Sequence, residues 1–459
     1  MYKINFHQPI HVHFIGIGGI SMSGLAQILL QEGFMVSGSD SKRSDLTAQL
    51  EAAGAGIAIG QRAANITPDI DLVVYTAAIH PDNPEYMQAK AAGIPMLSRA
   101  EFLGQLMTNY HTSAAVAGTH GKTTTTGMLT HILLEAQTDP TVSIGGMLQT
   151  IGGNIRVGKT DYFLTEACEY TNSFLHFYPT FSVILNIEED HMDFFDDLAQ
   201  IRQSFRSFAS NTAPDGKIII NSAIAHPQEI YAGLPAAAVT FGLKEDADYT
   251  AADIAYDAGG RAAFTLCAHG KRTERITLKI PGRHNIENAL AAAACAAEAG
   301  LPFAAIRTGL ASYGGTARRF ERKGSLGGIT IIDDYAHHPT EIRATLSAAR
   351  PLCEGRLICV FQPHTYTRTK AFWDAFADAL CLADIVVLAE VYAARETDTL
   401  GISGEKLAAA ITAKGTESHY FSTFDEIENF LLKKCINRDL LITMGAGDVY
   451  KIGDSLLGI

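Results

Sequence analysis

The chain has 459 residues, of which 47% are hydrophobic and 19% are charged, and it contains 41 glycines. This composition is that of a globular α/β protein and argues against a disordered or fibrous chain. The 36 basic and 49 acidic residues give a net charge of -13, whereas a general nucleic-acid binder needs a basic surface, so we expect no nucleic-acid partner.

Cysteine usage and the N-terminus indicate where the protein works. The seven cysteines are scattered and form no C-x-x-C pair, so the sequence predicts neither a disulfide framework nor a zinc site. The N-terminus lacks the basic and apolar regions of a signal peptide. The alanine-rich run at 289–299 is too short to span a bilayer. We therefore expect a cytoplasmic protein without membrane insertion.

The first hundred residues alternate predicted strands and helices. We expect strands at 11–16 and 34–39 with a helix at 21–32 between them, which makes a βαβ unit. The first turn, 16–21, reads Gly-Ile-Gly-Gly-Ile-Ser and resembles G-x-G-x-x-G, except that a serine replaces the last glycine. Asp40 follows at the spacing of a ribose-contacting acid, so the segment predicts a nucleotide site.

A second glycine-rich turn begins the central part of the chain. Residues 118–125 read Gly-Thr-His-Gly-Lys-Thr-Thr-Thr, after an apolar strand at 113–117 and before a helix with an apolar stripe. Backbone N–H groups of such a turn surround phosphate oxygens, Lys122 reaches the β- and γ-phosphates, and the Thr123 hydroxyl ligates Mg²⁺. Val116 stands where the general pattern has glycine, so a plain strand-to-helix turn is the alternative.

Two apolar runs after this loop end in acidic side chains. The run at 162–165 leads to Glu166 and Glu169, and the run at 181–187 leads to an acidic segment, 188–193, that contains His191. If both strands neighbour the loop strand, these groups reach one sheet edge and provide the oxygen ligands that Mg²⁺ prefers. For most of the acidic segment we favour a solvated turn, whereas Glu169 and His191 are candidate ligands.

The alternation of strands and helices divides the chain into three α/β domains. We expect an N-terminal Rossmann-like domain at 1–110 and a central domain at 111–316. The central domain has a parallel sheet of the P-loop ATPase type and a small antiparallel β patch at 240–281. A C-terminal Rossmann-like domain at 317–459 follows, with a helix beginning at Lys370.

Polar residues cluster at three further places. Asn285 and Asn288 lie near the start of the alanine-rich helix, where Asn285 is either a helix cap or, with Asn288, a ligand-facing pair. The segments 333–341 and 362–369 follow apolar strands directly. Pro339 and Glu341 fit an ordinary helix start, which leaves the other polar groups of the first segment without a structural role.

Seven segments together resemble the Mur ligases of peptidoglycan synthesis and occur in that family's order. The resemblance covers nearly the whole chain. Residues 13–24 and 333–341 are most similar to the members that join L-alanine to UDP-N-acetylmuramate. The seven segments are GTHGKTTT (118–125), EACEYTNSF (166–174), NIEEDHMD (186–193), GRHNIENA (282–289), ARRF (317–320), DDYAHHPTE (333–341) and QPHTYTRT (362–369).

The resemblance implies an ATP-dependent ligase. ATP would phosphorylate the lactyl carboxylate of UDP-N-acetylmuramate, and the amine of L-alanine would displace phosphate from the acyl phosphate. Mg²⁺ at two sites would assist, with Mn²⁺ as the alternative metal, and the protein would be a monomer or a homodimer. Within the family, the alternative is the recycling ligase that attaches an intact murein tripeptide to the same sugar nucleotide.

The resemblance also implies the roles of individual residues. Lys122, Glu169 and His191 are the catalytic candidates. The metal ligands would be Thr123, Glu169, His191 and Glu166. ATP would contact Gly118, Thr119, His120, Gly121, Lys122, Thr123, Thr124, Asn285, Asn288, Arg319 and Asp334. The UDP substrate would contact Gly16, Ile17, Gly18, Gly19 and Asp40, and the amino acid would contact Tyr335, His337 and Arg368.

One departure from the family is clear. Several Mur ligases carry a carbamylated lysine after the histidine-bearing segment, but no lysine occurs between His191 and Gly216, so this group is excluded here. Two alternative functions from other protein classes are a nicotinamide-dependent oxidoreductase, in which the N-terminal turn binds the cofactor, and a non-catalytic nucleotide switch. The first leaves the phosphate loop without a role, and the second predicts ATP binding without substrate-dependent phosphate release.

Overall fold

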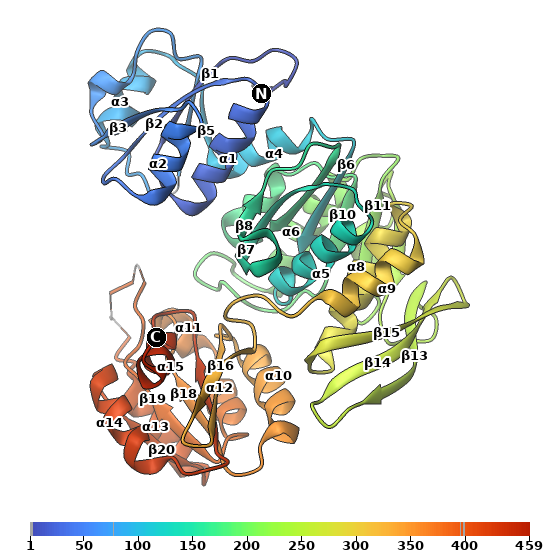
Figure 1. Ribbon diagram of the computed structural model, residues 1–459, viewed down its shortest axis with the longest axis vertical. Coiled ribbons are helices and arrows are strands. Elements are labelled where there is room, and N and C mark those ends of the chain that lie inside the picture. Colours follow the sequence, from blue (N-terminus) through green and yellow to red (C-terminus); the bar gives the residue numbers. More distant parts are fainter. Residues whose placement is uncertain (1–2, 77, 395, 398–399) are drawn as a thin grey trace.

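The computed structural model describes residues 3–76, 78–394, 396–397 and 400–459, and it contains three α/β domains in chain order (Figure 1). In the described part of the N-terminal domain, five parallel strands have the order β3-β2-β1-β4-β5. The strands are β1 His11–Ile15, β2 Met35–Asp40, β3 Gly56–Ile59, β4 Leu72–Tyr75 and β5 Met96–Ser98. The helices are α1 Ile20–Gln31, α2 Asp45–Ala52, α3 Pro84–Ala91 and α4 Arg99–Met107, with the 3-10 turn η1 Ala63–Asn65.

The central domain is built on a ten-stranded sheet within the described residues, in the order β15-β14-β13-β12-β11-β10-β6-β9-β7-β8. The strands are β6 Thr112–Ala117, β7 Thr141–Leu148, β8 Gly153–Arg156, β9 Tyr162–Ala167, β10 Phe181–Ile184, β11 Lys217–Asn221, β12 Ala237–Phe241, β13 Tyr249–Tyr256, β14 Arg261–Ala268 and β15 Lys271–Pro281. The antiparallel patch is present as β13–β15, and it continues the main sheet through β12.

The helices of the central domain cover this sheet. They are α5 Lys122–Glu135, α6 Leu198–Ser210, α7 Gln228–Tyr231, α8 His284–Glu298 and α9 Phe303–Ser312, with η2 Gln149–Ile151 and η3 Tyr170–His176. The alanines of α8 before Ala297 are buried, which lets this helix pack closely against α5. Asn285 lies inside α8, whose N-cap is Arg283, so the reading of Asn285 as a helix cap is wrong.

In the C-terminal domain, the six described strands of the sheet run β16-β17-β21-β18-β19-β20, with β16 antiparallel at the edge. The strands are β16 Glu321–Leu326, β17 Ile329–Asp334, β18 Leu357–Phe361, β19 Ile385–Leu388, β20 Glu417–Tyr420 and β21 Leu440–Met444. The helices are α10 Pro339–Ala349, α11 Tyr366–Ala371, α12 Trp373–Leu380, α13 Gly404–Ala413, α14 Phe424–Lys434 and α15 Tyr450–Leu457, with η4 Arg350–Leu352.

One expected helix start in this domain is wrong. The helix expected from Lys370 begins at Tyr366, because the Thr365 hydroxyl accepts a hydrogen bond from the backbone N–H of Arg368 and caps it. Thr365 has a φ of +64°, a left-handed conformation that the sequence does not signal. As a result, Arg368 is held on a helix rather than on a loop.

The N-terminal domain fits tightly against the central domain at two glycines. A Cβ atom on Gly24 of α1 would lie 2.0 Å from the Cδ1 atom of Ile155 in β8. A Cβ atom on Gly104 of α4 would lie 1.9 Å from the carbonyl oxygen of His176. Both helices therefore approach the central domain so closely that only glycine fits at these positions.

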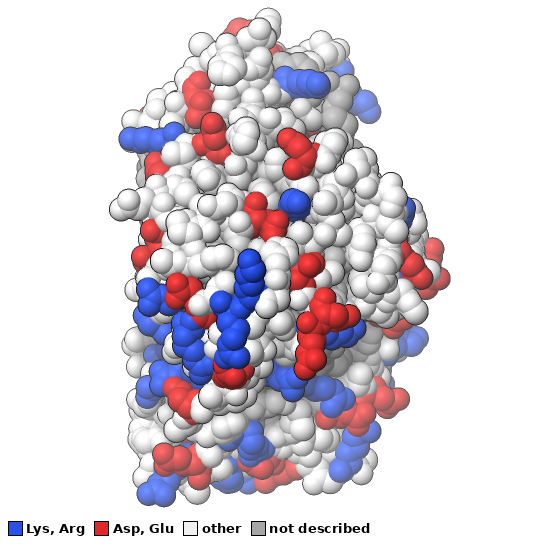
Figure 2. Space-filling model, turned by 90° about the vertical axis from the view of Figure 1, so that its right-hand side faces the viewer, with Lys and Arg blue, Asp and Glu red and all other residues white. Residues whose placement is uncertain are grey.

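Two further features concern the hydrophobicity of the helices and the charge of the surface. No helix in the described ranges is both long and apolar enough to cross a membrane. On the face shown in Figure 2, basic and acidic side chains are interspersed, so this face is not uniformly basic.

Candidate active site

The phosphate-loop sequence connects β6 to α5 as a tight turn. Gly118 and Gly121 have φ values of +146° and +85°, which a residue with a side chain rarely adopts. Gly121 occupies the N-cap position of α5, and no side chain caps this helix end. A Cβ atom on Gly121 would also lie 2.6 Å from Asn288 Oδ1. The backbone N–H groups at the start of α5 thus remain available to an anion.

The strands on either side of β6 bring the expected groups to this turn. Ala117 at the end of β6 is in register with Ala167 of β9 and with Ile184 of β10. Both neighbours are parallel to β6, so the segments after them leave from the same sheet edge as the loop. This arrangement confirms that the two acidic segments flank the loop.

Lys122 is paired with a buried carboxylate. Its Nζ lies 2.9 Å from Oε2 of Glu169, and it also donates to the carbonyl oxygen of Thr119 at 3.2 Å. Burial by itself would lower the pKa of Lys122, but the negative charge of Glu169 outweighs it and raises the pKa. Lys122 is therefore a permanent positive charge at the loop.

The four predicted metal ligands lie around the same turn. Thr123 donates its hydroxyl to Oε2 of Glu166 at 3.1 Å, and Nε2 of His191 lies 3.9 Å from Oε1 of Glu169. Burial raises the pKa of Glu166, and the charges of Arg319 and Lys122 oppose this shift only in part. A hydroxyl and buried carboxylates form an oxygen-rich donor set that suits a divalent cation such as Mg²⁺.

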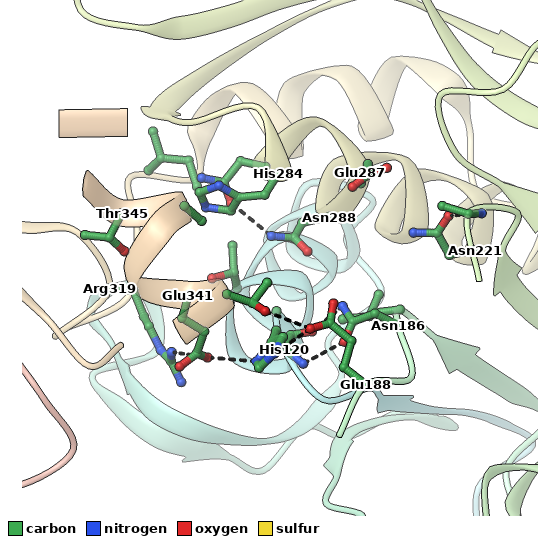
Figure 3. A pocket seen from close by; sticks show the side chains of 18 of the residues that line it. His120, Asn186, Glu188, Asn221, His284, Glu287, Asn288, Arg319, Glu341 and Thr345 are labelled. Carbon is green, nitrogen blue, oxygen red and sulfur yellow. Dashed lines mark hydrogen bonds and ion pairs between the residues drawn. The ribbon is translucent and has the colours of Figure 1, made fainter. Parts of the chain in front are cut away.

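A cavity of about 390 Å³ opens beside the loop between the central and C-terminal domains (Figure 3). Seven of the residues predicted to contact ATP line it: His120, Gly121, Thr124, Asn285, Asn288, Arg319 and Asp334. Gly118, Thr119, Lys122 and Thr123 are not among its lining residues. Thr123 adjoins it, because its hydroxyl lies 3.5 Å from Nη2 of Arg319.

The cavity also contains side chains that sequence reasoning missed. Asn186 and Asn221 line the central-domain side, and Glu341 and Thr345 of α10 line the other side. Asn221 is the last residue of β11 and Asn186 follows β10. The sequence did contain a signal for these two asparagines, since polar residues at the carboxyl ends of parallel strands commonly face a ligand.

Asn285 and Asn288 form one hydrogen-bonded chain with the loop helix. The Asn288 amide donates to Oδ1 of Asn285 at 3.0 Å, and the Thr125 hydroxyl donates to Oδ1 of Asn288 at 3.3 Å. The Asn285 amide donates to the carbonyl oxygen of Pro281 at 2.6 Å. These bonds fix both amides at the cavity wall.

Asp334 and Arg319 reach the cavity from the C-terminal domain. Asp334 accepts hydrogen bonds from the backbone N–H groups of Phe320 and Ala336 at 2.8 and 2.7 Å. Its complete burial raises the pKa to about 6. The Arg319 guanidinium lies 5.1 Å from the ring centroid of Tyr335, a cation–π contact that orients both side chains.

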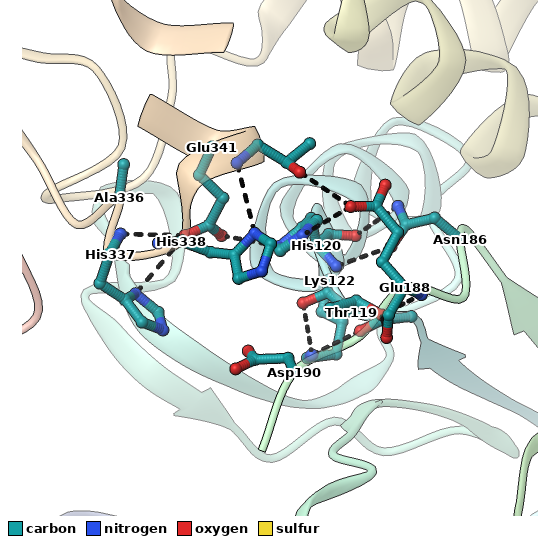
Figure 4. A network of polar contacts seen from close by, with 12 residues as sticks. Thr119, His120, Lys122, Asn186, Glu188, Asp190, Ala336, His337, His338 and Glu341 are labelled. Atoms are coloured by element: carbon teal, nitrogen blue, oxygen red, sulfur yellow. Dashed lines mark hydrogen bonds and ion pairs between the residues drawn. The ribbon is translucent and has the colours of Figure 1, made fainter. Parts of the chain in front are cut away.

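His120 of the phosphate loop connects the central and C-terminal domains (Figure 4). Its Nδ1 lies 3.3 Å from Oε1 of Glu341, and its Nε2 lies 3.5 Å from Oε2 of Glu188. The Thr340 hydroxyl donates to Glu188 at 2.8 Å. Burial opposes a charge on His120, but the two carboxylates outweigh it and raise its pKa to about 9.

The neighbouring His338 is neutral. Burial, followed by the charge of His120, lowers its pKa to about 4. Its Nε2 lies 3.1 Å from the carbonyl oxygen of Glu189, and its Nδ1 accepts a hydrogen bond from the Thr340 N–H. His120, Glu188 and His338 are also the one group of three potential metal ligands within 4.8 Å in the described chain, and it was not predicted.

We expect the joint between these domains to weaken in alkali. Because the folded pKa of His120 is raised to about 9 from 6.5, its stabilising charge is fully present below pH 6.5 and is lost as the pH rises through 9. The difference corresponds to on the order of 3 kcal/mol. Thermal unfolding from pH 6 to 10 should show this loss in the wild type but not in His120→Asn. Equal pH dependence of both proteins would contradict this assignment.

The acidic segment 188–193 is only partly a solvated turn. Asp190 is 5% exposed, and its Oδ1 accepts a hydrogen bond from Arg368 Nε at 2.9 Å across the domain boundary. The solvated reading is therefore wrong for Asp190 and for Glu188, which bonds to Thr340. It holds for Glu189 and Asp193, which are exposed.

Arg368 lies in a cluster with the other residues that were predicted to contact the amino acid. Its Nη1 lies 2.8 Å from Nδ1 of His364, and its Nη2 lies 3.5 Å from Nδ1 of His191. The rings of His337 and His364 are 5.7 Å apart, and His337 also contacts the ring of Tyr335. Burial lowers the pKa of His191, His337 and His364, so this cluster is made of neutral imidazoles around one guanidinium.

The N-terminal glycine turn is braced by Asp40. The Oδ2 atom of Asp40 accepts a hydrogen bond from the backbone N–H of Gly18 at 2.9 Å. The N–H groups of Gly16 and Ile17 donate to the carbonyl oxygen of Ser39. Asp40 thus shapes the turn that was predicted to bind the UDP moiety, and its contact with the substrate remains a prediction.

Comparisons with known proteins agree with this arrangement. Three family models match in sequence order. They are the Mur ligase family catalytic domain at 11–111, the Mur ligase middle domain at 116–296 and the Mur ligase glutamate ligase domain at 318–447. The chain is 59% identical over 457 residues to UDP-N-acetylmuramate–L-alanine ligase of Agathobacter rectalis, and the match covers 100% of both chains.

The chain belongs to the Mur ligase family.

Solved structures of Mur ligases have the same architecture. The UDP-N-acetylmuramate-alanine ligase of Thermotoga maritima matches with a TM-score of 0.78 and 30% identity, over 98% of each chain. A murein peptide ligase of Psychrobacter arcticus matches with a TM-score of 0.69 and 28% identity, also over 98% of each chain. The three-domain α/β fold expected from the sequence is confirmed, and ATP-dependent ligation is the activity of this family.

Proposed function

We propose that this Mur ligase joins L-alanine to the lactyl carboxylate of UDP-N-acetylmuramate at the expense of ATP, in the synthesis of peptidoglycan precursors. The observation that carries the proposal is the position of the Lys122–Glu169 pair in the loop whose residues His120 and Gly121 line an interdomain cavity large enough for a nucleotide. The names of the full-length relatives supply the substrates.

The first step is phosphoryl transfer. A lactyl carboxylate oxygen attacks the γ-phosphorus of ATP, the bond to the β-γ bridging oxygen breaks, and ADP leaves. This step brings an anion to a polyanion, so the charge of Lys122 and the free N–H groups of α5 lower its barrier. Arg319, beside Thr123, contributes a second positive charge.

A divalent cation would share this work. Thr123 and Glu169, with Glu166 as a further candidate, would hold Mg²⁺ or Mn²⁺ bound with ATP, and His191 would hold a second ion. When bound, such ions neutralise phosphate charge and orient the reacting oxygens.

The second step forms the amide bond. The amine of L-alanine attacks the acyl carbon, the carbon–oxygen bond to phosphate breaks, and phosphate and a proton are released. Tyr335, His337 and Arg368 would position the amino acid, with the guanidinium suited to its carboxylate. Asp190 pairs with Nε of Arg368, and Nη1 and Nη2 each direct one N–H to a histidine, so the second N–H of each is the one available to this carboxylate.

The ligase that attaches a murein tripeptide is the alternative, since one similar structure is a murein peptide ligase. We expect kcat/KM for L-alanine to exceed that for the tripeptide by roughly 100-fold or more, because the acceptor pocket selects by size. Phosphate release should be measured with ATP, Mg²⁺ and UDP-N-acetylmuramate, with L-alanine, glycine, L-serine or tripeptide as acceptor. Preferential turnover of tripeptide would overturn the proposal.

A further inference from the structure

Arg99, an arginine at the boundary of the N-terminal domain, forms no ion pair among the residues that the structure describes. Arg99 is the first residue of α4, directly after β5, and its Nη1 donates to the Ser21 hydroxyl at 3.2 Å. Ser21 is the second residue of α1, immediately after the glycine turn 16–19. In Figure 1, both helices lie on the side of their sheet that faces the central domain.

Within the described residues, no carboxylate lies within 4.0 Å of the Arg99 guanidinium. Burial lowers its pKa, and the Cys168 thiol of the central domain is the group that opposes this shift. Arg99 nevertheless stays charged at neutral pH, because an arginine pKa lies far above it. Keeping a partly buried guanidinium beside a hydroxyl, with no carboxylate near it among the described residues, costs free energy that a bound anion would offset.

Two helix N-termini add to the positive electrostatic potential around Arg99. Arg99 is at the N-terminus of α4, and the helix N-terminus of α1 beside it has no side-chain cap. Helix N-termini carry partial positive charge, so an arginine there is unfavourable without an anion. Glu101, the acidic residue of the first turn of α4, is used in the capping box with Ser98 and does not approach Arg99.

We propose that Arg99 positions the diphosphate of the UDP-sugar over the glycine turn, which makes it a substrate-positioning residue that deepens the proposed function and rests on it. A guanidinium donates two parallel hydrogen bonds to phosphate oxygens, and the uncapped start of α1, directly after the turn, supplies backbone N–H groups on the adjoining side. Ser21 holds the guanidinium beside the turn. The lactyl carboxylate belongs instead beside Lys122, where the phosphoryl group arrives.

Calorimetric titrations of Arg99→Gln distinguish a contact of Arg99 with the diphosphate from a contact with the lactyl carboxylate. UDP-N-acetylglucosamine carries the diphosphate without the lactyl group, and uridine carries neither. We expect the variant to lose roughly 10- to 100-fold in affinity for both UDP-N-acetylmuramate and UDP-N-acetylglucosamine, and nothing for uridine. A loss confined to UDP-N-acetylmuramate would assign Arg99 to the carboxylate, and an unchanged affinity for both sugars would remove it from the substrate site; either result overturns the inference.

Thermal unfolding without ligand distinguishes a positioning role from a structural one. Removing an uncompensated cation should leave Tm unchanged or raise it, whereas a structural arginine would lower it. Lys90→Gln, on the exposed surface of α3, is the matched control and should bind both sugars as the wild type does. If the wild type itself binds neither sugar, the proposed function fails. If the wild type binds both sugars and Arg99→Gln binds them equally well, this inference alone fails.

Discussion

Replacing Lys122 with alanine should reduce kcat for ligation by at least about 10³-fold, because the charge that offsets the approach of a carboxylate to ATP is lost. The effect should fall on kcat as well as on ATP affinity, since the developing charge on the transferred phosphoryl group is greatest in the transition state. Initial rates of phosphate release at saturating substrates measure it. The control Lys271→Ala removes an exposed lysine of β15 and should have normal activity.

The structure adds a complication to this variant. Glu169 is 2% exposed and pairs with Lys122, so the substitution leaves a buried carboxylate without its cation. The double variant Lys122→Ala/Glu169→Gln removes that charge and should recover part of any lost stability while remaining inactive. Near-normal turnover in either variant would show that Lys122 is not the catalytic cation.

Replacing Arg368 with alanine should reduce kcat/KM for L-alanine by roughly 100-fold, because the guanidinium that would hold the amino-acid carboxylate is lost. It should also destabilise the joint between the domains by about 3 kcal/mol, since Asp190 would be buried without its partner. Varying L-alanine at fixed ATP measures the first effect, and thermal unfolding measures the second.

Two further variants separate these effects. Arg368→Ala/Asp190→Asn removes both charges and should restore stability without restoring affinity for L-alanine. Arg368→Lys keeps the charge but loses the forked geometry, so it should remain impaired. If the double variant regains normal kcat/KM, Arg368 acts only as a joint between domains, and the amino acid is bound elsewhere.

The sequence was sufficient for the fold because each domain repeats a strong local pattern. Apolar strands at 113–117 and 181–187, with the glycine turn at 118–125, predicted the parallel core and its carboxyl edge. The register of β6 with β9 and β10 confirms that Glu166, Glu169 and His191 meet there. Such positions are predictable because the carboxyl ends of adjacent parallel strands converge.

The contacts between domains could not be predicted in the same way. Glu341 reads as an ordinary residue of a helix start, and it does cap α10, but it also faces His120 from another domain. Asp190 reads as part of an exposed acidic turn until Arg368, 178 residues away, covers it. Partners this distant leave no periodicity or spacing in the sequence, so their burial appears only when the domains pack.

The two joints of the molecule differ in kind. The N-terminal domain meets the central domain at Gly24 and Gly104 through close contacts with the Ile155 side chain and the His176 carbonyl oxygen, which neither protons nor salt can alter. The C-terminal domain meets it through the ion pairs of His120 and Arg368, which both can alter. Solution conditions therefore act on the wall of the interdomain cavity while the N-terminal domain keeps its place. The contact of the N-terminal domain is thus insensitive to pH and salt, and the sensitivity of the enzyme to the ionic state of the cell is concentrated at the C-terminal domain.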